Sequence, residues 1–315
     1  MTTLERPEDL PSSVPGTVVT VGNFDGVHVG HARLIRRACE LGRQLGLASV
    51  VFTFDPHPAA VLQPDKAPVP LTDRIRKVEL LGRLGVDFVL VYPTDRQLLS
   101  LSWHAFLEDI LWRKLRVRAV VEGPDFRFGH GREGHVGLLQ SWAQVRQVHV
   151  EIVPSVEVDG RAVSSSEVRQ LLRAGQVGEA NKLLLEPYRV RGRVVEGARR
   201  GRTLGYPTAN LVDIPMLLPA EGIYAGRAYV YERSGVYPAA ISLGPNPTFS
   251  EHQLKFEAYL LDFAGDLYGQ EVEIEFLERL REVRHFTSVN ALLDQMARDV
   301  EAVRQIVEIR EPVGR

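Results

Sequence analysis

The sequence predicts an α/β N-terminal domain with a doubly wound parallel sheet, followed by a small antiparallel β-barrel with a C-terminal helix. Apolar strand-like runs and helical patterns alternate from Val18 to Val153, as they do in a parallel sheet covered by helices. From Tyr188 onward, short strand-like runs are separated by glycine and proline, which is typical of a barrel. Because Pro187 ends the alternating region, we expect domains at residues 1–186 and 187–315.

The first half begins with a β-branched run that ends at Val21 and predicts a buried strand. Apolar positions at helical spacing then predict a helix from near His28 to Gly46. A later helix, at 73–84, is expected to have Thr72 as its N-cap and Gly85 as its stop. The other expected elements are strands at 48–54, 86–92, 117–121 and 148–153 and helices at 103–115 and 137–145.

The second half contains five runs with strand character and one long amphipathic pattern. The final pattern has apolar residues at the spacing of a single helix face, and it predicts a helix at 288–307. The expected strands lie at 189–195, 223–231, 236–243, 256–261 and 272–277.

Composition limits the classes of function. The chain of 315 residues is 44% hydrophobic and 25% charged, a globular composition long enough for two domains. A net charge of −2 argues against a protein that coats nucleic acid. No apolar run reaches the roughly 18 residues of a membrane span, and the one cysteine, Cys39, has the position of a core residue. We therefore expect a cytoplasmic protein with no nucleic-acid or membrane partner.

The segment between the first strand and the first helix predicts a nucleotide phosphate site. It reads GNFDGVHVGH and includes Gly22, Asn23, Phe24, Asp25, His28, Gly30 and His31. Glycine lets the backbone turn sharply and approach a ligand, and the N–H groups of a helix N-terminus favour an anion. The two histidines are three residues apart, so both rings can reach one phosphate and donate hydrogen bonds or, if protonated, charge. A lone histidine here would more simply be a surface residue.

Two more motifs follow strands, at the sheet edge where ligands of such folds bind. Asp55-Pro56-His57-Pro58 forms a stiff turn, and its residues leave a simple loop and a functional segment equally open. The second motif, at 123–129, contains Asp125, Phe126 and Arg127. Aromatic rings beside an arginine suit a flat ring with phosphates, although the same rings could anchor a loop.

A serine-rich segment begins the helix expected after residue 164. Ser164 and Glu167 fit a capping box, which is the simplest interpretation. A cap needs only one serine, however, so Ser165 has a spare hydroxyl at a positive helix end. Arg169 lies about one turn further on, where it could reach a phosphate. We expect Ser164, Ser165 and Arg169 to bind phosphate.

The second domain carries a glycine- and arginine-rich segment that ends in Pro207-Thr208-Ala209-Asn210. The backbone at Gly197, Gly201 and Gly205 can wrap phosphates, while Thr208 and Asn210 offer hard oxygens to Mg²⁺. From the residues alone, this interpretation and a simpler one are equally good; in the simpler one the arginines lie in a solvated basic loop and Pro207 to Asn210 form a turn. Glu257 lies in an otherwise apolar strand, where a carboxylate is costly unless it is paired or used; an outward-pointing side chain would be the simple alternative.

The motifs taken together resemble a known family. The first segment resembles the H-x-G-H signature of the nucleotidylyltransferase superfamily, and the full string is similar to that of bacterial bifunctional riboflavin kinases and FAD synthetases. The segment that ends at Asn210 resembles the flavokinase loop, and Gly244 to Phe249 also looks like a family loop. The resemblance covers about residues 17 to 300, in family order. It implies that the second domain makes FMN from riboflavin and ATP, and that the first makes FAD from FMN and ATP.

The resemblance also implies roles for individual residues. Glu257 matches the base that takes the proton of the ribityl hydroxyl, and Thr208 with Pro207 and Asn210 matches the segment that holds Mg²⁺ and ATP. His28 and His31 match the groups that stabilise charge during adenylyl transfer. Asn23 and Asp125 would border the flavin or the nucleotide, with asparagine the more usual family residue at 125. Phe256 departs from the family, where a small aliphatic residue is more usual.

The expected partners are small molecules, namely riboflavin, FMN and ATP, with FMN and FAD as products. The protein is expected to be a monomer or a weak homo-oligomer. One alternative is a nucleotidylyltransferase of another substrate with an RNA-binding barrel, which the near-neutral charge disfavours. Another is a non-catalytic flavin-binding protein, which would be expected to lack H-x-G-H, P-T-A-N or Glu257, and all of these are present.

Overall fold

The computed structural model describes residues 1–197, 201, 204–231, 235–245 and 254–309. The chain divides into two compact units, Met1–Ser164 and Ser165–Arg315. This division reflects packing alone. The expected boundary between residues 186 and 187 separates the domains that we expect to carry the two activities, and it stays a prediction.

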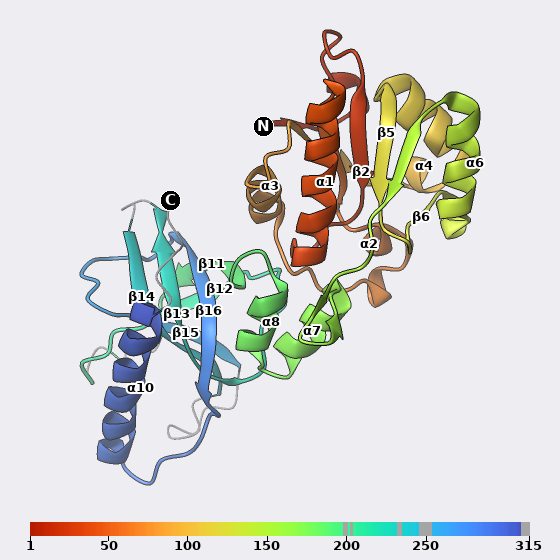
Figure 1. Cartoon of the computed structure of the whole chain (residues 1–315). Helices are drawn as coiled ribbons and strands as arrows, with labels where there is room; N and C mark the ends of the chain where they lie inside the picture. The colour runs from red at the N-terminus through yellow and green to blue at the C-terminus, as the bar shows by residue number, and fades with distance from the viewer. Residues whose placement is uncertain (198–200, 202–203, 232–234, 246–253, 310–315) are drawn as a thin grey trace. The chain divides into compact units, whose positions relative to one another are not determined.

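The first unit is built on a six-stranded parallel sheet with the strand order β1-β4-β3-β2-β5-β8 (Figure 1). Its strands are β1 (Thr2–Leu4), β2 (Thr17–Val21), β3 (Ala48–Asp55), β4 (Phe88–Pro93), β5 (Val117–Glu122) and β8 (His149–Ile152). Its longer helices are α1 (Val29–Leu45), α3 (Arg74–Gly82), the π-helix η3 (Phe106–Lys114) and α6 (Val136–Arg146). The predicted doubly wound parallel sheet is confirmed.

Short elements connect these strands and helices. They are η1 (Pro7–Asp9), α2 (Pro58–Leu62), η2 (Pro64–Lys66), α4 (Arg96–Leu99), α5 (Trp103–Ala105), β6 (Arg127–Phe128), η4 (His130–Arg132), β7 (Gly134–His135), β9 (Glu157–Val158) and β10 (Arg161–Ala162).

The strand β2 shows why the sheet is covered on both faces. All five of its residues are buried, and its three valines alternate between two apolar clusters. Val18 packs with Ala38 and Leu41 of α1, whereas Val19 packs in the cluster that contains Leu107 of η3. Because both of its faces are packed, β2 has a fixed position in the sheet. This position sets the point at which the chain leaves the sheet after Val21.

Two local expectations for the first unit need correction. The N-cap of α3 is Asp73, whose side chain accepts the Arg76 backbone N–H at 2.6 Å, so the expectation of Thr72 was wrong. Thr72 instead hydrogen-bonds the Asp25 carboxylate. The expected elements of the first half begin with the strand that ends at Val21, yet Thr2–Leu4 pairs with β4 as an edge strand. By contrast, α1 ends as expected at Gly46, which has φ 67°.

The second unit holds a closed antiparallel barrel with the strand order β11-β12-β15-β14-β13-β16 (Figure 1). The strands are β11 (Arg189–Val195), β12 (Ala209–Val212), β13 (Gly222–Val230), β14 (Gly235–Gly244), β15 (Lys255–Leu260) and β16 (Glu271–Arg281). The described part of this unit includes the helices α7 (Ser165–Arg173), α8 (Val177–Leu183) and α10 (Val289–Ile309). The predicted barrel and final helix are confirmed, while β12 and α8 had not been expected.

The helix α10 lies against the outer face of the barrel. Val303 is fully buried with Ala225 and Leu261, and Asp299 pairs with Arg281 at 2.8 Å. Along β15 the side chains alternate, so that Phe256 and Ala258 are buried inside the barrel while Glu257 is half-buried on its outer face. This alternation places Glu257 on the accessible side of the strand.

Candidate active sites

The turn after β2 leads directly into α1, and His28 is the N-cap of that helix. The Nδ1 atom of His28 accepts a hydrogen bond from the His31 backbone N–H at 3.2 Å. A nitrogen that accepts carries no proton, so the neutral His28 ring has its proton on Nε2. His28 therefore closes the helix end with one nitrogen and keeps a donor N–H on the other.

The two histidine rings stack on each other and are both electrically neutral. Their centroids lie 3.5 Å apart with an interplanar angle of 15°. Burial lowers the pKa of His28 to about 4. Burial, with smaller effects from His28 and Lys77, lowers the pKa of His31 well below its ordinary value. Lowered pKa values favour the neutral form of both rings, and a neutral ring can donate a hydrogen bond without carrying charge.

The histidines border a cavity of 280 Å³ at the carboxyl ends of β2 and β5. The sequence had indicated several of its lining residues, which are Gly22, Phe24, His28, Gly30, His31, Asp125 and Phe126. His31 Nδ1 is a buried atom without a hydrogen-bond partner among the described residues, as expected of a group that awaits a ligand. The geometry suits a phosphate next to the start of α1.

Glu122 also lines this cavity, and sequence reasoning missed it. Its carboxyl is 2% exposed and accepts the Val21 backbone N–H at 2.6 Å. Burial raises the pKa of Glu122 well above its ordinary value. The sequence held no signal for it, because a glutamate at the end of a strand more often faces solvent.

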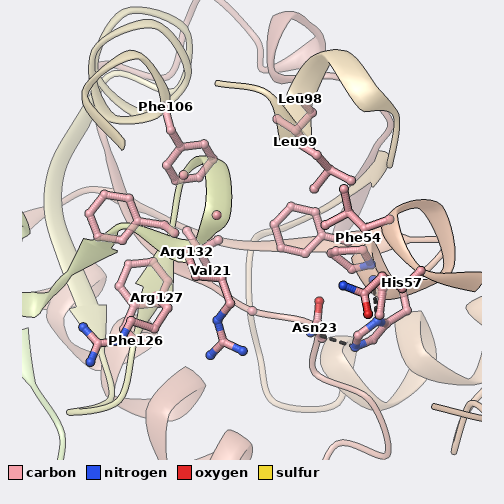
Figure 2. Close-up of a pocket in the computed structure, with 18 of the residues that line it drawn as sticks. Val21, Asn23, Phe54, His57, Leu98, Leu99, Phe106, Phe126, Arg127 and Arg132 are labelled. Carbon is pink, nitrogen blue, oxygen red and sulfur yellow. Dashed lines mark hydrogen bonds between the residues drawn. The ribbon is translucent and has the colours of Figure 1, made fainter. Parts of the chain in front are cut away.

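A second cavity, of 480 Å³, adjoins the first and shares Val21, Gly22 and Phe126 with it. Figure 2 shows aromatic side chains from separate elements around this space. They are Phe54 of β3, Phe106 of η3, Phe126 and Phe128. The rings of Phe126 and Phe128 stack with centroids 5.0 Å apart. Flat apolar walls of this kind suit a flat ring system.

Basic side chains lie at the edge of the aromatic cavity. Lys66, Arg127 and Arg132 line it and are exposed to solvent. Asn23 and His57 line it as well, which gives the Asp-Pro-His-Pro segment a place in the site. The sequence had indicated Asn23, Phe126 and Arg127, but not Phe54, Phe106, Lys66 or Arg132. A cavity with apolar walls and cations at its edge fits an aromatic ligand that carries an anion.

Phe24 and Asp25 point into the protein. Phe24 is 2% exposed and meets the His31 ring edge-on at 5.1 Å between centroids. The carboxylate of Asp25 accepts the backbone N–H groups of Leu71 and Thr72 at 3.0 and 3.1 Å. Both residues support the turn in the structure, and their expected contact with a ligand stays a prediction.

Ser165 and Arg169 belong to α7, in the second compact unit, while Ser164 ends the first. Arg169 is 7% exposed, and its guanidinium donates to the Ser165 carbonyl at 3.3 Å. The expected role of these three residues in phosphate binding stays a prediction.

In the barrel, antiparallel pairing brings the predicted polar residues together. Asn210 of β12 lies opposite Glu257 of β15, and Ser242 of β14 lies opposite Glu257 on the other side. Opposite residues in such a pair have Cβ atoms about 5 Å apart and share a face of the sheet. Thr208 immediately precedes β12. The pairing therefore places Asn210 and Glu257 within reach of one ligand.

Three glycines of the segment before β12 are favoured by their surroundings or their backbone conformation. A Cβ at Gly197 would collide with the Asn210 amide, and one at Gly201 would collide with the Tyr206 carbonyl. Gly205 has φ 86°, which favours glycine. A cavity of 640 Å³ lies beside this segment, and its lining residues include Val194, Pro207, Thr208, Leu260 and 263–268. Residues 198–200, 202–203 and 246–249, which carry other parts of the predicted loops, lie outside the described residues.

Two family models match the chain, one in each half. The FAD synthetase model matches residues 10–167, and the riboflavin kinase model matches residues 184–307. With an adenylyl-transfer domain in the first half and a phosphoryl-transfer domain in the second, the chain falls in the class of nucleotide-dependent transferases that act on flavins.

Curated relatives match nearly the whole chain. A bifunctional riboflavin kinase/FMN adenylyltransferase from Escherichia coli (strain K12) is 36% identical over 297 residues, which cover 94% of this chain and 95% of that one. Its counterpart from Listeria monocytogenes is 38% identical over 290 residues and covers 91% of each chain. A crystal structure described as a macrolide-efflux protein from Streptococcus pneumoniae superposes with TM-score 0.84 at 34% identity, over 96% of this chain and 98% of that one. The chain belongs to the bifunctional riboflavin kinase/FMN adenylyltransferase family.

The comparisons agree with the resemblance seen in the sequence motifs. The riboflavin kinase match spans the barrel, which leaves the RNA-binding alternative without support. Among the described residues, no helix combines the length and apolar character needed to cross a membrane.

Proposed function

We propose that this chain performs the two activities of its family at two separate sites, one in each compact unit. In the first reaction, the terminal phosphoryl group of ATP passes to the ribityl hydroxyl of riboflavin and gives FMN and ADP. In the second, the AMP part of another ATP passes to FMN and gives FAD and pyrophosphate. The observation that carries the proposal is the pair of adjoining cavities in the first unit, one beside the histidines and one lined by aromatic rings.

For adenylyl transfer, we assign ATP to the histidine cavity and the flavin ring to the aromatic cavity. The FMN phosphate then meets the α-phosphorus of ATP at their shared wall, near Gly22. A phosphate oxygen of FMN forms the new bond to this phosphorus, and the bond to the pyrophosphate oxygen breaks. No protein nucleophile is needed, so the protein acts by positioning and by stabilising charge.

His28 is well placed to stabilise that charge without carrying any itself. Its Nε2–H is free to donate to a phosphoryl oxygen while Nδ1 remains bonded to the His31 N–H. The N–H groups at the start of α1 add to this stabilisation. The arrival of an anionic phosphate would also raise the pKa of both buried histidines, since a nearby opposite charge favours the protonated ring.

For phosphoryl transfer, Glu257 is the base that accepts the proton of the ribityl hydroxyl. The resulting oxygen attacks the terminal phosphorus of ATP, and ADP leaves. The half-buried position of Glu257 on the outer face of β15, opposite Asn210, supports this role. The glycines at 197, 201 and 205 allow the preceding segment to lie close to the ATP phosphates.

Thr208 and Asn210 are the residues that would hold Mg²⁺. Their hard oxygens suit this ion, and the close packing of Asn210 against Gly197 fixes the amide beside the segment that wraps phosphate. When bound, Mg²⁺ neutralises charge on the phosphates of ATP. Two neutral ligands from the protein are consistent with a metal that keeps water and phosphate as its other ligands.

The remaining features of the proposal follow from the substrates. We propose that the protein works in the cytoplasm, where ATP is available, and that it acts as a monomer or a weak homo-oligomer. Each unit has its own cavities, so neither reaction requires a second copy of the chain.

The proposal is tested by separating flavins chromatographically after incubation with riboflavin, ATP and Mg²⁺. The unmodified chain should yield FMN and FAD. His28→Ala should stop at FMN, and Glu257→Ala should make FAD only when FMN is supplied. If the unmodified chain returns both riboflavin and added FMN unchanged, the proposed function is wrong.

A further inference from the structure

Asn23 and His57 form a pair at the junction of the two cavities in the first unit. Both line the aromatic cavity, and Asn23 directly follows Gly22, which lines both cavities. The Asn23 backbone is fixed, because its carbonyl accepts the Thr53 hydroxyl at 3.0 Å. The role of the His57 side chain is not explained by either reaction as described above.

The hydrogen bonds of His57 fix the position of its ring proton. His57 is the N-cap of α2, and its Nδ1 accepts the Ala59 backbone N–H at 3.1 Å. A backbone N–H can only donate, so Nδ1 has no proton. The proton of the neutral ring is therefore on Nε2, and this N–H points to the Asn23 amide, 2.9 Å away.

The donor on His57 in turn fixes the orientation of the Asn23 amide. Two N–H groups cannot form a hydrogen bond with each other, and the oxygen and nitrogen of an amide are told apart by their partners. The amide oxygen of Asn23 must therefore face His57, and the NH₂ group must occupy the other end. Figure 2 draws the amide nitrogen of Asn23 toward His57 and the oxygen away from it, and the donor on His57 requires these two atoms to be exchanged. Asn23 thus presents two N–H donors on the side opposite His57.

We propose that the Asn23 NH₂ group binds an oxygen of the FMN phosphate, and that His57 is the positioning residue that sets its orientation. The inference rests on the proposed function, which brings the FMN phosphate to the wall at Gly22. An N–H donor favours a charged phosphate oxygen, and hydrogen bonds to ions are stronger than those between neutral groups. The aromatic walls, by contrast, suit the ring. The pair therefore lets the site distinguish FMN from riboflavin.

The experiment measures FMN adenylylation by the full chain carrying Glu257→Gln, so that riboflavin is not consumed. Asn23→Asp keeps the shape and still accepts from His57, but it replaces the donors with a negative charge. We expect the KM for FMN to rise by about ten- to a hundred-fold, the scale of a hydrogen bond to an ion. Riboflavin, added as an inhibitor, lacks the phosphate, and its inhibition constant should change by less than about threefold.

The role of His57 is tested by a cycle of variants. His57→Phe should raise the KM for FMN, and in an Asn23→Ala background it should have no further effect, because it acts only through Asn23. His57→Gln keeps an N–H toward Asn23 and should restore part of the affinity. His149→Phe is the matched control, since His149 is an exposed histidine of the same unit. A merely structural role for His57 would instead lower stability equally in both backgrounds.

Three outcomes would overturn the inference. An unchanged KM for FMN in Asn23→Asp would mean that the amide does not contact the phosphate. A parallel rise in the inhibition constant of riboflavin would mean that it contacts the flavin ring. An additive effect of His57→Phe in the Asn23→Ala background would remove His57 as its positioning residue. Tryptophan fluorescence reports folding of these variants, because Trp103, Trp112 and Trp142 all lie in the first unit. Loss of adenylylation by the parent would reject the proposed function instead.

Discussion

The two proposed nucleotide sites of this chain are built from differently exposed groups. In the first unit, His28 is 7% exposed and Glu122 is 2% exposed, and burial shifts the pKa of each. In the barrel, Thr208, Asn210 and Glu257 are all half-buried side chains on or beside outer strand faces. Desolvation sets the protonation of the groups in the first site, so the stability of that unit should depend on pH. Close backbone packing positions the groups of the second site, so its activity should fall when a side chain is added there.

The largest expected effect is the loss of one reaction without the other when the proposed base of the barrel is replaced. Glu257→Gln keeps the shape of the side chain but cannot accept a proton, so we expect kcat for riboflavin phosphorylation to fall by about 10²–10⁴-fold. Steady-state rates with riboflavin and ATP measure the change. FMN adenylylation should be unaffected, and Glu308→Gln, an exposed glutamate of α10, is the matched control. A loss smaller than about threefold would show that Glu257 is not the base.

The next effect concerns acid stability of the first unit. The pKa of His28 is about 4 in the folded chain against an ordinary 6.5, so the folded state binds fewer protons than the unfolded state in this range. Stability should therefore fall as the pH drops from about 6.5 to about 4, by about 3 kcal/mol from this residue. Burial of His31 acts in the same direction.

The measurement is urea unfolding followed by tryptophan fluorescence at pH 7 and pH 4. His28→Asn retains an N-cap acceptor without a titrating ring, so its loss of stability between these pH values should be smaller by the His28 share. Equal losses in the variant and the parent would mean that His28 is not desolvated in the folded chain.

The smallest expected effect concerns packing in the barrel. A methyl group at Gly197 would displace the Asn210 amide, so Gly197→Ala should lower riboflavin phosphorylation by about tenfold, the scale of one misplaced ligand interaction worth about 1.4 kcal/mol. Gly178→Ala in α8 is the matched control, because the space beside Gly178 is open to within ordinary contact distance. Unchanged phosphorylation in Gly197→Ala would mean that the position of Asn210 does not matter for the reaction.

The sequence predicted those parts of the sites that depend on local pattern. The strand, glycine turn and helix around His28 lie within thirty residues of one another, so spacing alone indicated the site. Glu257 stood out because a carboxylate interrupts an apolar strand. The alternation of elements likewise predicted the parallel sheet and the barrel.

Other features depend on tertiary contacts that no local pattern reports. Phe54 and Phe106 read as ordinary core residues of a strand and a helix, and only packing brings them to one cavity. Thr72 and Asp73 are both good N-cap residues. In the structure Asp73 caps α3, while Thr72 hydrogen-bonds the distant Asp25. The four residues of β12 read as part of a loop, because pairing with β11 and β15 rather than propensity makes them a strand.

The central claim is that the two reactions take place at independent sites, and mixing two variants that each lack one of the two activities tests it most directly. His28→Ala retains the phosphorylation site, and Glu257→Ala retains the adenylylation site. Neither variant alone should convert riboflavin to FAD, whereas an equimolar mixture should make FAD through FMN released into solution. If the mixture accumulates FMN without FAD, or makes no flavin product at all, the assignment of one reaction to each site is wrong.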